Sequence, residues 1–157
     1  MGLTSIEIGR HDEAALSYRH CLLCERLCEV DRIDGDQGDC GAGTEARVYR
    51  HRVEYGEEIE LVPSHLFYLS GCNLRCAFCI AEHNAIDSRR GRPLTAPFFQ
   101  DAIAWGRQQG ATNVQWVGGE PTIHLAAILA AMDLAELRGA MGITQEELAS
   151  RLSIACV

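Results

Sequence analysis

Two short apolar runs, each followed at once by a loop of unusual composition, constrain the fold of this chain most strongly. The first run, residues 66–69, leads into three closely spaced cysteines, and the second, residues 114–117, leads into Gly-Gly-Glu-Pro at 118–121. Near-continuous apolar runs of this length are typical of strands in a buried parallel sheet. Between them a helix is predicted over 96–109, with Pro97 in its first turn. The order predicts two strand–loop–helix units, with both loops where a strand ends.

The first loop carries Cys72, Cys76 and Cys79, spaced CxxxCxxC. A closed metal site generally needs four protein ligands, because a tetrahedral ion or a cubane cluster has four corners to fill. Three thiolates on one loop could instead hold three irons of a [4Fe–4S] cluster and leave the fourth open for chemistry. Two alternatives stay open: His83 could complete a Cys₃His zinc site, or the three cysteines could be buried structural residues.

Together, the cysteine loop and the Gly-Gly-Glu-Pro turn resemble the signatures of the radical SAM superfamily, including the aromatic Phe78 directly before the last cysteine. The resemblance implies a [4Fe–4S] cluster and S-adenosylmethionine (SAM) as cofactors. It places Phe78 beside the SAM adenine, and Gly118, Gly119 and Glu120 at the methionine end. It also implies reductive cleavage of SAM to a 5′-deoxyadenosyl radical that abstracts hydrogen from a substrate, with the cofactors supplying the hard chemistry. No further catalytic residue is assigned.

A second group of cysteines lies nearer the N-terminus: Cys21, Cys24, Cys28 and Cys40. Residues 12–29 are predicted to form a helix with Asp12 as its N-cap, which would place the first three at i, i+3 and i+7 on one face. Cys40 would return from a glycine-rich loop at 31–43. Four thiolates could then form a structural zinc site or an auxiliary cluster. The alternative is a cysteine-lined helix face that packs without metal. Cys156 is interpreted as a free thiol.

This segment is similar to the N-terminal part of proteins related to the pyruvate formate-lyase activating enzyme, and in particular to an activase-homologous group of Fe–S proteins. There the segment commonly reads Cys-x-Leu-Cys-Pro-Arg, and here Glu25 replaces the proline. The resemblance, which covers about residues 18–132, implies an activase-like protein. It also implies an electron donor such as flavodoxin or ferredoxin, and a protein as one class of substrate.

The implied fold is α/β: the N-terminal part of a partial (β/α)6 barrel, preceded by a Cys-rich helix and a β-hairpin. Residues 1–63 would hold that helix, a loop and a strand pair at 47–62. Residues 64–133 would form a truncated core of two βα units, ending in a helix over 123–138. Because the family barrel has six strands, the chain is interpreted as truncated or fused. Its exposed sheet edges predict poor solubility or self-association.

Residues 134–157 are expected to form C-terminal helices. Within them, residues 134–152 resemble the first two helices of a phage-repressor-type helix-turn-helix domain, with a capping box at Thr144 and Glu147. The helix that enters the major groove in that family would follow them. A net charge of −8 argues against a nucleic-acid surface, so a DNA-binding regulator is the weaker hypothesis.

Eight cysteines in 157 residues could also suggest a disulfide framework. However, the first residues show no basic segment followed by an apolar stretch, so no signal peptide is visible. The longest apolar run, residues 125–132, is too short to span a bilayer. Clustered cysteines in a cytosolic protein point to metal or redox chemistry. We therefore expect a cytoplasmic radical SAM enzyme or, as the alternative, a non-catalytic iron–sulfur or zinc-binding protein.

Overall fold

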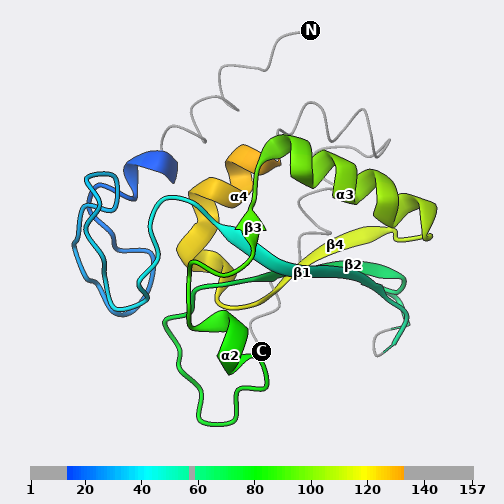
Figure 1. Cartoon of the computed structure of the whole chain (residues 1–157), viewed down its shortest axis with the longest axis horizontal. Helices are drawn as coiled ribbons and strands as arrows, with labels where there is room; N and C mark the ends of the chain where they lie inside the picture. Colours follow the sequence, from blue (N-terminus) through cyan, green and yellow to red (C-terminus); the bar gives the residue numbers. More distant parts are fainter. Residues whose placement is uncertain (1–13, 57–58, 133–157) are drawn as a thin grey trace, which may run out of the picture.

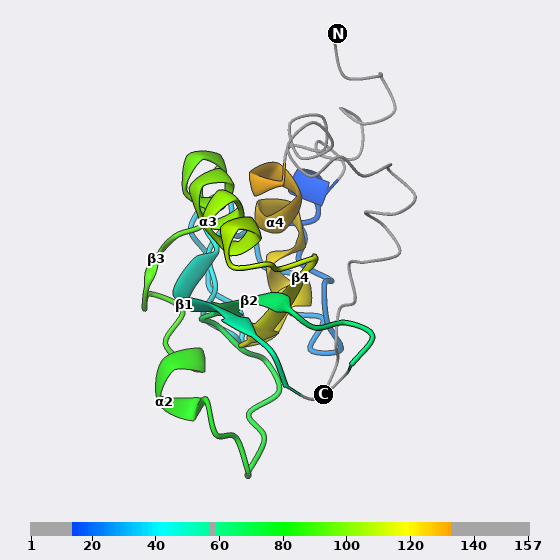
Figure 2. The same ribbon diagram turned by 90° about the vertical axis from the view of Figure 1, so that its right-hand side faces the viewer.

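The computed structural model describes residues 14–56 and 59–132, which form a four-stranded mixed sheet with helices on it (Figure 1). The strands are β1 (Arg47–Glu54), β2 (Ser64–Leu69), β3 (Arg92–Pro93) and β4 (Asn113–Gly118). The helices are α2 (Glu82–Ala85), α3 (Ala96–Gln108), the 3-10 helix η1 (Pro121–His124) and α4 (Leu125–Ala131). The helices α3 and α4 lie side by side on one face of the sheet, and α2 lies on the other side (Figure 2).

The strand order in the sheet is β3-β1-β2-β4. Strands β2 and β4 are parallel, with Leu66 opposite Gln115 and Leu69 opposite Gly118. This pairing, with α3 as the crossover between the strands, confirms the prediction of two strand–loop–helix units. Strand β1 runs antiparallel to both β2 and β3.

The core lies between the sheet and the helices α3 and α4. The ring centroids of Phe67 on β2 and Phe99 on α3 are 5.2 and 5.3 Å from that of Trp116 on β4. The helix begins as predicted, because the Thr95 side chain accepts a hydrogen bond from the Phe98 amide at 3.3 Å. Burial of such large aromatic side chains is the main driving force for this packing.

The predicted helix over residues 12–29 is wrong for its larger part. Only residues 14–16 of the described chain are helical there, and the backbone at Cys21 turns away. The Cys21 amide donates to Val30 O and the Glu29 amide donates to Cys21 O, both at 3.1 Å. Leu16 and Leu22, apolar residues within this range, are exposed, so a helix would gain no packing from them. The loop predicted at 31–43 is confirmed.

The predicted strand pair within 47–62 is also wrong. Its first half is β1, but residues 59–61 form a turn, and Ile59 is exposed. The antiparallel partner of β1 is instead β2. The alternate side chains Phe67 and Leu69 of β2 are fully buried, and this burial stabilises β2 within the sheet.

The helix predicted over 123–138 is divided in the structure. It begins with the turn η1, continues as α4 and reaches its C-cap at Met132. The rest of that prediction, the helix-turn-helix-like segment at 134–152 and Cys156 lie outside the described residues. No helix among the described residues is long and apolar enough to cross a bilayer.

Candidate functional site

The ends of β2 and β4 are joined by three hydrogen bonds to three consecutive carbonyls. Leu69 O accepts from the Gly119 amide at 2.7 Å, and Gly71 O accepts from the Glu120 amide at 3.0 Å. Between them, Ser70 O lies 2.8 Å from Nε2 of His124 and accepts from it. The start of the cysteine loop is therefore bonded directly to the Gly-Gly-Glu-Pro turn, although the two are about fifty residues apart in the chain.

Two glycines make this close approach possible. A Cβ atom at Gly119 would lie 2.0 Å from Gly71 O, a contact that no side chain can make. Gly71 has φ +93°, and its Cβ would lie 2.9 Å from His124 Nε2. Both positions therefore require glycine for reasons of space, and Gly71 also for its backbone conformation.

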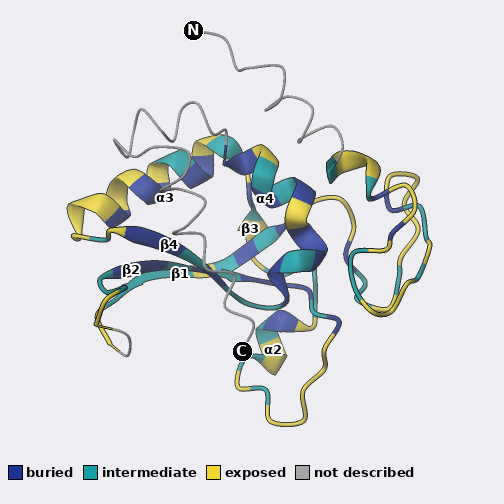
Figure 3. Ribbon diagram, turned by 180° about the vertical axis from the view of Figure 1, so that it is seen from behind, coloured by how far each residue is buried: buried dark blue, intermediate teal, exposed yellow. Residues whose placement is uncertain are grey.

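The two loops line one cavity of about 480 Å³. The predicted site residues around it are Cys72, Cys76, Cys79, Phe78, Gly118, Gly119 and Glu120. Tyr68 and Val117, the last outward-facing residues of the two strands, also contribute to the wall. The cysteine loop, which contributes one side of this cavity, is largely exposed and lies beside α2 (Figure 3).

The three cysteine thiols lie at the cavity without forming a preassembled metal site. Among the described residues, no group of three or more His, Cys, Asp or Glu side chains converges in that way. Cys76 is exposed, and Cys72 and Cys79 are partly buried. The interpretation as buried structural cysteines is therefore wrong. His83 is exposed and does not line the cavity, so this geometry gives no support to a Cys₃His zinc site.

The residues present fit a [4Fe–4S] cluster and SAM. Three free thiols on one loop are the soft ligands that iron–sulfur clusters require. Opposite them, Glu120 is buried at the cavity wall, and its Oε1 accepts hydrogen bonds from the Thr122 amide at 2.9 Å and from the Thr122 hydroxyl at 2.7 Å. A carboxylate has about four acceptor positions, so capacity for an ammonium group remains.

His124 is a site residue that the sequence analysis did not identify. It is fully buried, and this burial lowers the pKa of its imidazole to about 4, although the hydrogen bond to Ser70 acts in the opposite direction. The ring is therefore neutral near pH 7. The only sequence signal was its position three residues after Pro121.

Arg32 was also missed. Its side chain is 2% exposed, yet its partners are carbonyls: Gly43 O at 3.0 Å from Nε and Ile123 O at 2.7 Å from Nη1. Its guanidinium carbon lies 4.1 Å from the centre of the Tyr18 ring. Nη1 is also 3.9 Å from Cys21 Sγ.

The N-terminal cysteines lie in irregular loops rather than on a helix face. Cys21 is buried, and Cys24, Cys28 and Cys40 are partly buried. Cys28 Sγ accepts from the Asp39 amide at 3.5 Å, one residue before Cys40. Burial raises the pKa of the Cys40 thiol; Arg32 lowers it, and nearby Cys21 and Cys24 raise it further. The chain therefore gathers the four cysteines in one region.

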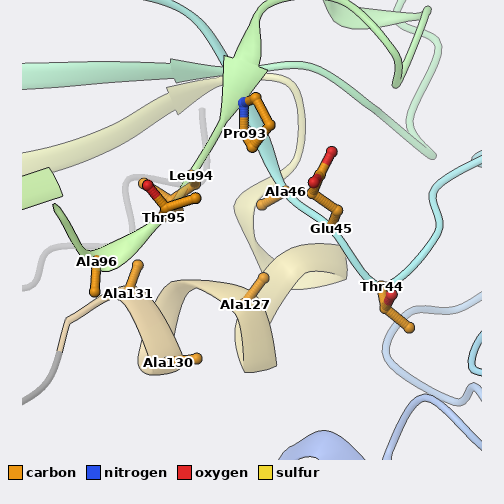
Figure 4. A pocket seen from close by; sticks show the side chains of 10 residues that line it. All are labelled: Thr44, Glu45, Ala46, Pro93, Leu94, Thr95, Ala96, Ala127, Ala130 and Ala131. Atoms are coloured by element: carbon orange, nitrogen blue, oxygen red, sulfur yellow. The ribbon is translucent and has the colours of Figure 1, made fainter. Parts of the chain in front are cut away.

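A second cavity, of about 330 Å³, lies between the β3–α3 junction and α4 (Figure 4). Its walls are mostly small side chains, among them Ala127, Ala130 and Ala131 of α4. The only charged residue in its lining, Glu45, is paired with Arg47 at 2.8 Å. It shares no residue with the cysteine cavity.

Residues 66–154 match the family model described as the radical SAM superfamily. The chain is also 32% identical over 120 residues to an uncharacterized protein of Methanocaldococcus jannaschii. That match covers 71% of this chain but 34% of the relative, so the chain spans about a third of the relative's length. No solved structure matches the chain.

Proposed function

Because the chain belongs to the radical SAM superfamily, we propose that it binds a [4Fe–4S] cluster through Cys72, Cys76 and Cys79 and uses it to cleave SAM. When bound, the cluster and SAM supply the reductive cleavage that yields a 5′-deoxyadenosyl radical for hydrogen abstraction. The observation that carries the proposal is the cavity shared by the three cysteines and the Gly-Gly-Glu-Pro turn.

The residues around this cavity would divide the work of binding. The three thiolates would hold three irons, so that the fourth stays open to the amino and carboxylate groups of SAM. Glu120, fixed by Thr122, would accept a hydrogen bond from the methionine ammonium. Gly118 and Gly119 would contribute the backbone of the turn to the methionine end, and they allow this turn to lie against Leu69 and Gly71. Phe78, which is 86% exposed, would cover the adenine.

The finer assignment rests on the resemblance of the N-terminal segment. We propose an activase-like role, with a one-electron donor such as flavodoxin or ferredoxin and a protein as substrate. We also propose that β2 and β4 are the first two strands of a partial (β/α)6 barrel. Their parallel pairing, with α3 as crossover, supports this fold. An oxygen-sensitive cluster suits the cytoplasm.

One observation favours a second candidate, a non-catalytic iron–sulfur or zinc-binding role. Phe78 and Cys76 lie at the exposed side of the cavity, and the described residues on that side include few that could enclose a nucleoside. A cluster could then be held there without productive SAM binding.

Electron paramagnetic resonance (EPR) of the anaerobically reconstituted, dithionite-reduced chain tests these alternatives. We expect a [4Fe–4S]⁺ signal that changes when SAM is added, and loss of this SAM-responsive signal in Cys72→Ser, Cys76→Ser and Cys79→Ser variants. His83→Ala, in α2 just after the loop, is the matched control and should keep the signal. A signal indifferent to SAM would favour the non-catalytic role, and zinc in place of iron would overturn the cluster assignment.

Glu120→Gln separates cluster binding from SAM binding. The amide keeps an oxygen for Thr122 but loses the negative charge that would attract an ammonium group. We expect an unchanged cluster signal and at least tenfold weaker SAM binding, measured from the SAM dependence of the spectrum. Equal SAM affinity in this variant would remove Glu120 from the proposed site.

A further inference from the structure

The side chain of Arg32 presents a charge that the described structure does not balance. Burying a guanidinium costs several kcal/mol unless an anion compensates it. In the described part of the chain, the arginines within ion-pair distance of a carboxylate are Arg19, Arg26, Arg47, Arg52, Arg75 and Arg89. Arg32 instead donates to two carbonyls and approaches Cys21 Sγ. The groups around this guanidinium are therefore two carbonyls, the Tyr18 ring and the sulfur of Cys21, and none of them is a carboxylate.

The backbone on either side of Cys28 has an unusual conformation. Leu27 and Glu29, on either side of it, have φ of 44° and 59°, in the left-handed region that non-glycine residues avoid. Such residues persist only where the surroundings hold them, and they cluster at ligand clamps. The Leu27 side chain is 56% exposed, so burial does not explain its conformation.

The same loops bring the remaining cysteines close. A Cβ atom at Gly38 would lie 3.0 Å from Cys28 Sγ, so the chain leading to Cys40 passes directly over that sulfur. The Asp39 amide points at it, and amide hydrogen bonds to sulfur are among the interactions that tune thiolate-bound metal centres. The backbone pairing of Cys21 with residues 29 and 30 folds the first cysteine back beside the third.

We propose that Cys21, Cys24, Cys28 and Cys40 form a closed four-thiolate metal site, separate from the cysteine loop at 72–79, whose negative charge is balanced by Arg32. Four thiolates around a divalent ion or a [4Fe–4S]²⁺ cluster leave net negative charge beside the guanidinium. The side chains are not preassembled in the described structure, so binding is expected to draw the four thiols together.

The position of this site gives it a function: it braces the cavity described above. Arg32 Nη1 donates to Ile123 O, next to the histidine that fixes Ser70. Two further hydrogen bonds join the N-terminal loops to the 72–79 loop. Arg26 Nη2 donates to Asn73 O at 3.4 Å, and Arg75 Nη2 donates to Asp39 O at 2.8 Å. Ser88 Oγ donates to Gly41 O at 2.6 Å, directly after Cys40. Metal binding by the N-terminal cysteines should therefore hold the 72–79 loop in place.

The metal site is tested in the full chain with Cys72, Cys76 and Cys79 all changed to Ser, which removes the other site. Titration with Co²⁺ should give one equivalent bound per chain, with the sulfur-to-cobalt charge-transfer bands and intense visible bands of tetrahedral thiolate coordination. Adding Cys28→Ser or Cys40→Ser should weaken binding at least 100-fold, whereas adding Cys156→Ser should not change it.

Loss of Co²⁺ binding only in the Cys28→Ser and Cys40→Ser variants supports the proposal, and circular dichroism shows whether these variants remain folded. If they do not fold, the Co²⁺ spectrum of the triple-Ser chain is still a test, because a spectrum without thiolate bands overturns the four-thiolate site. Disulfide formation among these cysteines under reducing conditions would overturn it too. Since the 72–79 site is absent here, failure of the proposed radical SAM chemistry cannot produce any of these outcomes.

Arg32 and the brace have separate tests. Arg32→Met removes the donors to Gly43 O and Ile123 O, so the metal-free protein should unfold more easily. Co²⁺ binding should also weaken at least tenfold, because the compensating cation is lost. Equal Co²⁺ affinity would remove Arg32 from the site. Amide exchange of residues 71–79 should slow when Zn²⁺ binds the triple-Ser chain and should not slow in its Cys40→Ser derivative. Exchange unaffected by Zn²⁺ in both would overturn the brace.

Discussion

At the scale of single residues, the His124 side chain donates a hydrogen bond to Ser70 O, whereas backbone amides donate to the neighbouring carbonyls of Leu69 and Gly71. The carbonyls of Leu69 and Gly71 accept from the main chain of the Gly-Gly-Glu-Pro turn, and that of Ser70 accepts from Nε2. Nδ1 is buried without a partner among the described residues. A charged ring would need a second acceptor there, which agrees with the lowered pKa.

His124→Ala tests this role. It leaves the buried Ser70 carbonyl without a donor, which should lower the free energy of unfolding by about 1–3 kcal/mol. His124→Gln retains an amide donor and should recover part of the loss. Urea unfolding measures both. In reconstituted protein, the SAM-induced change of the EPR signal should weaken in the alanine variant and return with glutamine. Equal stability of all three proteins would mean that the hydrogen bond contributes nothing.

Gly71→Ala should be costly for two separable reasons. The left-handed backbone conformation costs a residue with a Cβ about 1–2 kcal/mol, and the new methyl group would also press on His124 Nε2. Gly56→Ala is the matched control, because its Cβ would meet nothing within 4 Å. We expect a clear decrease in melting temperature for the first variant and almost none for the second. Similar melting temperatures would contradict the geometry at Gly71.

The sequence identified the residues whose chemistry is visible in their type, but not the ones that act by position. Cysteine spacing and the Gly-Gly-Glu-Pro turn predicted which residues line the cavity. Nothing in the local sequence shows that His124 will be buried under Ser70, or that Arg32 will reach Ile123, because both contacts join segments distant in the chain. Such roles depend on tertiary structure alone.

At the scale of elements, α3 is held on the sheet by a group of rings. His51 on β1 and His65 on β2 lie with Nδ1 and Nε2 3.0 Å apart, and the ring centroids of both are 5.5 Å from that of Trp105 on α3. Gly106 makes room, since a Cβ there would lie 2.3 Å from His65 Nδ1. Burial and, to a smaller extent, the nearby His51 lower the pKa of His65 to about 4. Burial and then Arg92 lower the pKa of His51.

Stability should therefore fall in mildly acidic solution. A histidine in the unfolded chain has a pKa near 6.5, so below that pH it binds a proton that the buried ring of the folded protein does not bind. The stabilisation is fully present above about pH 6.5 and decreases as the pH falls toward 4, by at most about 1.4 kcal/mol per pH unit for each histidine. Urea unfolding between pH 7.5 and 4.5 measures the slope.

The variant His51→Gln/His65→Gln is the comparison for that slope. It should unfold with a shallower dependence on pH, and what remains should include the contribution of His124. An unchanged slope would mean that neither ring stays neutral in the folded protein.

The sequence predicted the elements that have a buried face, but not the segments that lack one. The local pattern agrees with the packing in the apolar runs of β2 and β4 and in the capped, amphipathic α3. Residues 17–29 have helical spacing of leucines but no surface to bury them on, and the backbone is instead determined by contacts of Cys21 and Arg32. Periodicity cannot reveal that competition.

At the scale of the whole molecule, the cysteine cavity has an apolar rim. Leu74, Phe78 and Ile80 are all exposed beside it. Apolar side chains grouped in this way commonly mark a surface that another polypeptide covers. We expect this rim to be a second place of self-association, in addition to the exposed sheet edges considered in the sequence analysis.

Changing Leu74→Ser and Ile80→Ser together should reduce concentration-dependent association, because it removes apolar surface without touching a proposed ligand. Light scattering coupled to size-exclusion chromatography gives the mass over a range of concentrations. Leu16→Ser is the control, since Leu16 is also exposed but lies outside the cavity lining. A monodisperse monomer before any change would contradict the prediction.

The three bonded carbonyls at the end of β2 also determine where the chain can tolerate insertion. Leu69, Ser70 and Gly71 are hydrogen-bonded to the turn after β4. An extra residue among them would therefore move their carbonyls away from the donors that they face. The stretch between Cys79 and α2 has no such anchor to β4 in the described structure. A linker placed there, for a fused reporter or a tether to a redox partner, should lengthen the loop and leave the junction of the two strands in register.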